Sequence, residues 1–217
     1  TEKCMVIKNG CTSFPKRKLY KKGDPIKMIF QPTPWRGLNV LLAAMQMIKN
    51  KNIKLDVYSS TQVYGDAFKE ANDDKWVPLY KQASELPNVN YIGYRPNQFI
   101  LDNLQNYHIF AYPCIWEETS CISAIECMSA GLYSIVTNYG ALPETCSEFP
   151  IYVQYLQDYK LLAKSFATAI DIAADTLHLD VIQNNLNMQQ DFYKRFYNWE
   201  KQAETWSNFL RGVTNVK

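Results

Sequence analysis

Short apolar runs alternate with helical patterns along most of this 217-residue chain. The clearest runs, IKMIF at residues 26–30 and IFAY at residues 109–112, have the length of buried strands. Further strand patterns lie at residues 5–8, 54–59, 90–94, 133–138 and 151–153. Alternating strands and helices predict an α/β fold with a doubly wound, Rossmann-like parallel sheet. After residue 155 the pattern is helical to the end of the chain.

The composition is that of a globular domain. With 217 residues and 47% hydrophobic content, the chain is long enough to bury one core, so we expect residues 1–217 to form a single domain. The net charge of +2 gives no basis for nucleic-acid binding. No apolar stretch reaches the roughly 20 residues that cross a bilayer, and no secretory signal precedes the fold, so a cytoplasmic location is expected.

Basic residues gather at residues 16–22, and we predict that this run is a solvated loop. The alternative is a contact with an acidic acceptor or with lipid headgroups, which would be a peripheral membrane contact. The six cysteines show no paired spacing for a metal, so reduced thiols and no metal site are expected. His108 and His178 are isolated in the sequence and are predicted to be structural or exposed.

Two carboxylates stand around a predicted helix start. Glu118 follows the strand pattern at residues 109–112, and Glu126 lies in CISAIECMSAG, which has helical periodicity and ends at Gly131. A helix that begins near residues 119–121 presents free backbone N–H groups to an anion such as phosphate. Because carboxylates accept hydrogen bonds from the hydroxyls of a sugar or ribose, the run suits a ligand with hydroxyls at both ends and phosphates between. The alternative is a solvated helix face with a loop charge.

A second strand, loop and helix start lie earlier in the chain. IKMIF is followed by QPTPWRG and then by an apolar helical pattern from Leu38 to about residue 48. This order places Arg36 and Gly37 at a helix start, where Arg36 can clamp phosphate oxygens and Gly37 lets the backbone come close. The alternative is that Arg36 lies on the first turn of a surface helix, an unfavourable place for a cation.

Several polar or glycine positions come directly after predicted strands. In doubly wound sheets, ligands bind beyond the carboxyl ends of the strands. The positions that follow strand patterns are Arg36, Ser59, Ser60, Gly93, Tyr94, Arg95, Glu118 and Gly140. We therefore predict one ligand site at that edge of the sheet.

The spacing of Glu118 and Glu126, with GALPE at residues 140–144, resembles the nucleotide-sugar-binding domain of family 4 retaining glycosyltransferases of the GT-B fold. The resemblance implies that Glu118 contacts the donor sugar and that Glu126 contacts the nucleotide ribose. Arg36 and Gly37 would bind the donor diphosphate. The additional upstream Arg of the family is missing, because residues 31–33 are QPT.

The resemblance also implies which neighbouring residues contact the donor. Thr119, Ser120 and Cys121 stand where the family has Gly-aromatic-Gly, and their bulk would narrow the space beside the sugar. The remaining donor-binding positions that it implies are Ile122, Gly140, Tyr94 and Arg95, with the last two near the nucleobase.

By this resemblance the chain is the donor-binding, C-terminal half of a GT-B enzyme, and MVIKNG resembles the segment that opens such a domain. The absent N-terminal domain would hold a glycan, a lipid-linked acceptor or another hydroxyl acceptor, so the isolated domain is expected to be inactive. The implied reaction transfers a sugar from a nucleotide-diphosphate donor with retention, without metal or further cofactor. The alternatives are a non-catalytic nucleotide-sugar-binding module, a sugar-nucleotide epimerase and a phosphorylase.

The C-terminal helical region carries an aromatic stripe. Phe192, Phe196, Trp199 and Trp206 are spaced to lie on one helical face, and core packing is the prediction for such a stripe. The polar segment at residues 61–75 is predicted to form a loop or a short surface helix, and no chemistry is assigned to it.

Overall fold

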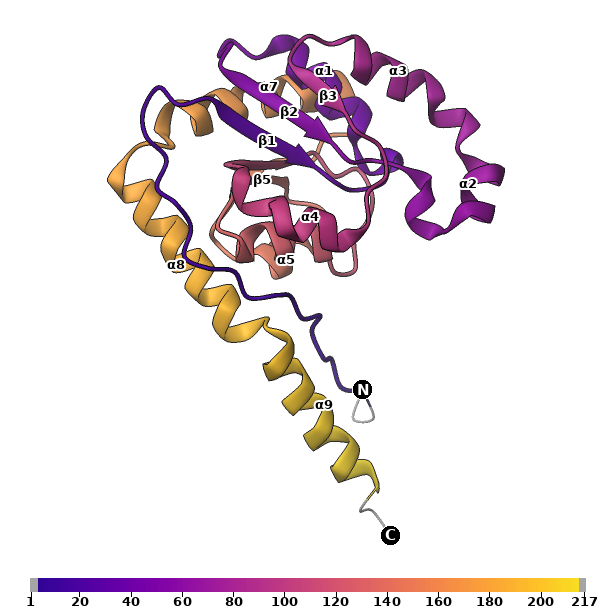
Figure 1. Ribbon diagram of the computed structural model, residues 1–217, viewed down its shortest axis with the longest axis vertical. Coiled ribbons are helices and arrows are strands. Elements are labelled where there is room, and N and C mark those ends of the chain that lie inside the picture. The colour runs from indigo at the N-terminus through magenta and orange to yellow at the C-terminus, as the bar shows by residue number, and fades with distance from the viewer. Residues whose placement is uncertain (1–3, 215–217) are drawn as a thin grey trace.

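The fold is built on one six-stranded parallel sheet with the strand order β3-β2-β1-β4-β5-β6 (Figure 1). A computed structural model describes residues 4–214. The strands are β1 (Ile26–Phe30), β2 (Ile53–Val57), β3 (Val89–Tyr91), β4 (Ile109–Tyr112), β5 (Tyr133–Thr137) and β6 (Ile151–Val153). This topology confirms the predicted doubly wound, Rossmann-like fold. The chain order reverses between β1 and β4, which pair through Met28 with Ile109 and through Ile29 with Phe110.

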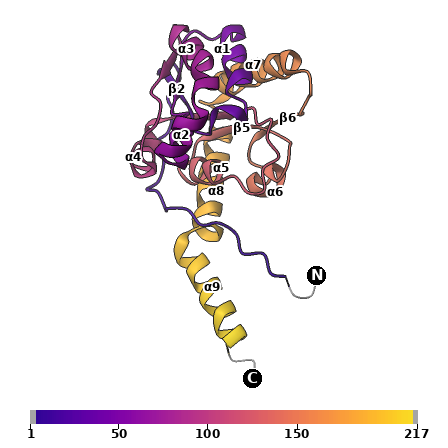
Figure 2. The same cartoon turned by 90° about the vertical axis from the view of Figure 1, so that its right-hand side faces the viewer.

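Helices cover both faces of the sheet, and Figures 1 and 2 show the two layers. One layer contains α1 (Leu38–Met47), α3 (Val77–Glu85) and α7 (Tyr159–Thr176), and α1 packs against the other two. The opposite layer contains α4 (Asn97–Asn103), α5 (Ile122–Ser129) and α8 (Asp180–Phe196). The short helix α6 (Leu142–Cys146) packs against α5.

The central strands are apolar because both faces of the sheet are covered. All residues of β4 and β5 are buried, and β1 exposes only Lys27. Four predicted strands match the structure within a residue. β2 ends two residues earlier than predicted, at Val57, and β3 is shorter than predicted and covers only Val89–Tyr91. The predicted strand at residues 5–8 is wrong. That segment has no regular structure and lies outside the sheet. Its last residue, Lys8, instead donates from Nζ to the Tyr197 hydroxyl at 3.3 Å.

The prediction that the aromatic stripe packs in the core is also wrong. The region is split into α8, which ends at Phe196, and α9 (Trp199–Thr214), so the stripe does not lie on one continuous helix. Figures 1 and 2 show that α9 points away from the sheet. Phe196, Trp199 and Trp206 are consequently 48%, 57% and 48% exposed, and only Phe192 packs against the core.

The basic run at residues 16–22 is solvated except at Arg17. The Arg17 Nε donates to Gly131 O at 2.9 Å, and its NH1 donates to Gln183 Oε1 at 2.7 Å. Arg17 is therefore buried beneath the end of α5, and the prediction of a wholly solvated loop is wrong at this position.

The polar segment at residues 61–75 contains α2 (Asp66–Asn72) between two single turns of 3-10 helix. Its apolar content was underestimated in the prediction. The Tyr64 ring stacks on Trp35 with centroids 6.0 Å apart, and Phe68 and Trp76 complete an aromatic cluster around Trp35.

Candidate donor-binding site

A hollow of about 350 Å³ lies beyond the carboxyl ends of β1 and β4. This is the point where the strand order reverses, and open α/β sheets bind their ligands there. The loops after β1 and β4 and the turn after β2 supply its walls. The lining residues are Gln31, Pro32, Thr33, Arg36, Val63, Tyr64, Tyr112, Glu118, Thr119, Ser120, Cys121, Ile122 and Ser123. The structure thus brings together Arg36 and the Glu118–Ile122 segment, which are far apart in sequence.

Arg36 and Glu118 form an ion pair inside this hollow. The side chain of Arg36 is 23% exposed and that of Glu118 is 5% exposed. Burial lowers the pKa of Arg36, but the hydrogen bond and the charge of Glu118 outweigh it, so the guanidinium stays protonated. Arg36 also lies over the Trp116 ring, 5.9 Å from its centroid. The guanidinium is therefore fixed at the mouth of the hollow.

The helix α5 begins at the floor of the site. Cys121 is its N-cap residue and makes no side-chain capping bond. Among the described residues no side chain caps this helix start, which is the arrangement expected of an anion site. The preceding loop is anchored by Asn9, whose Nδ2 donates to Ser120 Oγ at 3.0 Å. Thr119 and Ile122 are exposed at the surface of this loop.

Cys121 is buried, and burial raises the pKa of its thiol well above the usual value. A protonated, buried thiol is a poor nucleophile. All six cysteines lie within the described residues and are free thiols. Within residues 4–214, no group of three or more His, Cys, Asp and Glu side chains could hold a metal ion.

Glu126 lies one turn into α5 and is 6% exposed. Its Oε1 accepts a hydrogen bond of 3.0 Å from Asn97 Nδ2, at the start of α4. Burial raises the pKa of Glu126, and the bonds from Asn97 and Gln31 oppose that shift. The second carboxylate is thus at the same edge of the sheet as Glu118, outside the lining of the hollow and beside the loop that follows β3.

Gly37 and Gly140 allow close backbone approaches. Gly37 has φ 109°, and a Cβ there would lie 2.0 Å from Pro113 O. Gly140 has φ 58°, and a Cβ there would lie 2.6 Å from Glu118 N. Ala141 N also donates to Glu118 O at 2.8 Å. Both glycines therefore shape the loop that carries Glu118, a role that the sequence alone did not separate from ligand contact.

Tyr94 and Arg95 follow β3 at the same edge, but neither lines the hollow. The NH1 of Arg95 donates to the carbonyl oxygens of Ile92 and Tyr94, at 3.4 Å and 2.7 Å. Both side chains are exposed. Their predicted place near a nucleobase requires a ligand that extends from the hollow past Glu126.

Two polar atoms of the loop after β1 have no partner among residues 4–214. They are Gln31 Oε1 and Thr33 Oγ1, both buried in the lining of the hollow. Buried polar atoms normally have a hydrogen-bond partner, so these two are candidate contacts for a ligand. The sequence indicated only that the additional arginine of the family is missing at these positions.

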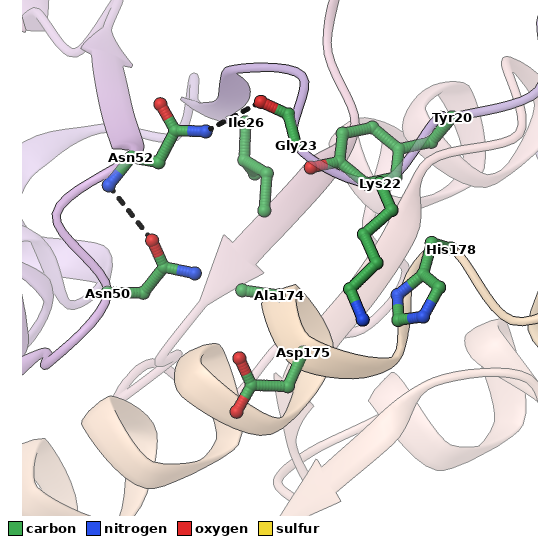
Figure 3. A pocket seen from close by; sticks show the side chains of 9 residues that line it. All are labelled: Tyr20, Lys22, Gly23, Ile26, Asn50, Asn52, Ala174, Asp175 and His178. Atoms are coloured by element: carbon green, nitrogen blue, oxygen red, sulfur yellow. Dashed lines mark hydrogen bonds between the residues drawn. The ribbon is translucent and has the colours of Figure 1, made fainter.

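A second hollow, of about 390 Å³, lies at the opposite end of the sheet (Figure 3). It is next to the amino ends of β1 and β2, where Asn52 N donates to Asn50 Oδ1 at 2.9 Å. Lys22, Asp175 and His178 also face it, from the loop before β1 and from the end of α7. None of the predicted site residues lies there. His108 is structural, because its Nδ1 accepts a hydrogen bond from Lys27 N at 3.0 Å.

The comparisons with known proteins agree with this geometry. The sequence profile of the family "Glycosyl transferases group 1" matches residues 12–185. The chain belongs to this family. A search of curated protein sequences found no match. This membership confirms the prediction of a glycosyltransferase domain, and the fold is that of one domain of a GT-B glycosyltransferase.

Solved structures share this fold at low sequence identity. A glycosyltransferase from Rickettsia africae ESF-5 is 16% identical with a TM-score of 0.69, and the match covers 91% of this chain and 50% of that one. Sucrose-phosphate synthase from Thermosynechococcus elongatus is 19% identical with a TM-score of 0.65, over 91% of this chain and 47% of that one. HepE from Anabaena, solved in complex with UDP, is 13% identical with a TM-score of 0.67, over 87% of this chain and 49% of that one. The chain thus spans about half the length of these structures. Within residues 4–214, no helix has the length and apolar content needed to cross a membrane.

Proposed function

We propose that this chain is the donor-binding half of a retaining, family 4 glycosyltransferase that transfers a sugar from a nucleotide-diphosphate sugar to an acceptor hydroxyl. The observation that carries the proposal is the meeting of Arg36, Glu118 and the start of α5 around one hollow at the reversal of the strand order. The UDP complex of HepE, which shares the fold, is consistent with a nucleotide ligand.

Each residue has a part in this proposal. Arg36 and the free N–H groups at the start of α5 hold the diphosphate, and Glu118 holds the hydroxyls of the sugar. Glu126 lies beyond Glu118 toward the β3 loop and accepts the ribose hydroxyls. Tyr94 and Arg95 then lie on the path of the base. The sugar is enclosed by Thr119, Ser120 and Cys121.

Departure of the diphosphate is the step that needs charge stabilisation. A fixed guanidinium and aligned backbone N–H groups supply it without a metal ion. We assign no protein nucleophile. The acceptor oxygen would bond to the anomeric carbon on the face that the diphosphate leaves, and the leaving phosphate would take the acceptor proton, which preserves the anomeric configuration. The acceptor would lie on a second domain, absent from this chain.

A thermal-shift screen with UDP-, GDP- and ADP-sugars tests donor binding. A donor at about 100 times its dissociation constant should stabilise the chain by roughly 2.7 kcal/mol, and a free hexose should not. The Arg36→Ala variant is the control, since it should lose the effect. Stabilisation by none of the three donors would contradict the proposal.

Two alternatives differ in what happens after binding. A non-catalytic module would bind the donor but give no product when the complete protein is supplied with acceptors. The missing second cation of the family, with QPT at residues 31–33, is the reason to test this alternative. A sugar-nucleotide epimerase would convert the donor alone into an isomer, which product analysis without acceptor detects.

A further inference from the structure

A single oxygen of Glu118 is shared by two donors. Its Oε1 accepts a hydrogen bond from Arg36 NH1 and another, of 2.5 Å, from the Tyr112 hydroxyl. Among residues 4–214, no group donates to the other oxygen, Oε2. The carboxylate is therefore held through one oxygen and presents the second one to a ligand.

The two donors differ in what a diphosphate would do to them. Of the side chains that line the hollow, Arg36 is the only cation, and its charge is offset by Glu118. A diphosphate carries more negative charge than one carboxylate and offers paired oxygens to the guanidinium fork. A diphosphate bound at the start of α5 would thus compete with Glu118 for Arg36.

Tyr112 cannot leave Glu118 in the same way. It is the last residue of β4, it is fully buried, and its register partner on β5 is Val136. Its ring packs against Phe110 and Phe30, with centroids 5.6 Å and 6.2 Å away. Burial raises the pKa of the phenol far above its usual value, as do the nearby Cys121 and Glu118, so the hydroxyl remains a donor.

We propose that Tyr112 is a positioning residue that keeps Glu118 in place when the donor diphosphate draws Arg36 away from that carboxylate. This inference rests on the proposed function. In the free chain the Arg36–Glu118 pair closes the diphosphate site. In the donor complex Arg36 binds phosphate, and Tyr112 alone fixes Glu118 for the hydroxyls of the sugar.

Calorimetry on the chain with UDP and UDP-glucose tests both parts of this proposal, the release of Arg36 and the positioning of Glu118. If the thermal-shift screen selects another base, GDP or ADP and the corresponding nucleotide sugar replace this pair. The variant Glu118→Gln frees Arg36, so the affinity of this variant for the nucleoside diphosphate should rise about fivefold. The matched control is Glu117→Gln, which removes the neighbouring exposed charge and should change that affinity less than twofold. An affinity that is unchanged or lower in Glu118→Gln would overturn the exchange of partners.

The variant Tyr112→Phe keeps the ring and removes only the hydroxyl. Its affinity for the nucleoside diphosphate should stay within twofold of that of the unaltered chain, whereas its affinity for the nucleotide sugar should fall about tenfold. Tyr193→Phe is the matched control, since Tyr193 is equally buried and its hydroxyl donates to Thr145 O at 2.6 Å, away from the site.

The outcomes separate this inference from the proposed function. Equal losses for diphosphate and nucleotide sugar in Tyr112→Phe would show a merely structural hydroxyl and overturn the positioning role, while the donor site would stand. If the unaltered chain binds neither ligand of any pair, the proposed function fails and this inference fails with it.

Discussion

Asn97 and Glu126 join two helices that follow non-adjacent strands. The Asn97 side chain donates to Glu126 across 3.0 Å, although β3 and β4 are separated by β2 and β1 in the sheet. The bond ties the start of α4 to α5 on one side of the sheet (Figure 1). It fixes Glu126 through Oε1, which orients this carboxylate for the ribose hydroxyls that we propose it binds.

Glu126→Gln should weaken binding of the free nucleoside diphosphate and of the intact donor alike. Losing hydrogen bonds to a charged acceptor should cost about 1.5 kcal/mol, which calorimetry measures as roughly a tenfold loss. The exposed Glu148 provides the control variant, Glu148→Gln, in which affinity should not change. Normal nucleotide affinity in a folded Glu126→Gln variant would remove the ribose assignment.

The same variant should be more stable than the unaltered chain at neutral pH. Burial raises the pKa of Glu126, so the folded chain holds this proton more tightly than the unfolded chain. At pH values above this raised pKa, the ionised carboxylate therefore lowers the free energy of unfolding. This cost shrinks as the pH falls through the raised pKa and is absent below the usual value of 4.5. Denaturant titrations should show the advantage of Gln shrinking as the solution is acidified. An advantage that grows in acid would contradict the sign.

Arg36→Lys keeps the positive charge but loses the planar fork. Its affinity for the nucleoside diphosphate should fall about tenfold, and its affinity for the bare nucleoside should barely change. Arg211→Lys is the matched control, because Arg211 is exposed on α9, which points away from the sheet and the site. Calorimetry with both ligands separates the two effects, and equal losses for nucleoside and diphosphate would indicate misfolding instead.

Gly37→Ala should displace the loop that carries Glu118. Its Cβ would lie 2.0 Å from Pro113 O, and φ is 109°. Gly65 has a similar φ of 97° but nothing within 4 Å of its Cβ position, so Gly65→Ala measures the backbone cost alone. Gly65 has a ψ of 166°, a backbone region that is essentially restricted to glycine, so we expect Gly65→Ala to cost about 1–3 kcal/mol and Gly37→Ala to cost clearly more in urea unfolding. Equal costs would show that the close approach to Pro113 is not important.

Arg17→Ala should destabilise the fold, although the sequence places it in a basic, solvated run. The loss of its bonds to Gly131 and Gln183 should cost about 1.5–3 kcal/mol. The adjacent Lys18 is exposed, and Lys18→Ala should change stability by about 0.5 kcal/mol or less. Similar unfolding midpoints for the two variants would contradict the buried role of Arg17.

The sheet could be predicted because its strands are buried on both faces. IKMIF, IFAY and YSIVT are short, mostly apolar runs, and the strands of the structure have almost the predicted bounds. The segment at residues 5–8 has the same local pattern, but it lies outside the sheet, and a local pattern does not contain that information. The stripe from Phe192 to Trp206 failed for a related reason, since the break at residues 197–198 ends the shared face.

The site was predictable to the extent that it is set by topology. Residues after β1 and β4 meet because parallel strands end at one edge, so Arg36 and Glu118 could be placed together. The partners of those residues could not be placed. The Tyr112 hydroxyl was hidden in a strand pattern, and Asn97 bonds Glu126 only because α4 and α5 share a layer. The sole available signal for Tyr112 was a polar group at the end of an apolar strand.

Backbone amide chemical-shift mapping during a titration with the selected nucleotide sugar tests the central claim most directly. We expect saturable shifts at residues 31–37 and 118–126, with the hollow of Figure 3 as an internal control. Amides around Asn50, Asn52 and His178 should stay unchanged, because they lie at the opposite end of the sheet. Shifts confined to that opposite end, or no shifts at a donor concentration of several millimolar, would contradict a donor site at the carboxyl ends of β1 and β4.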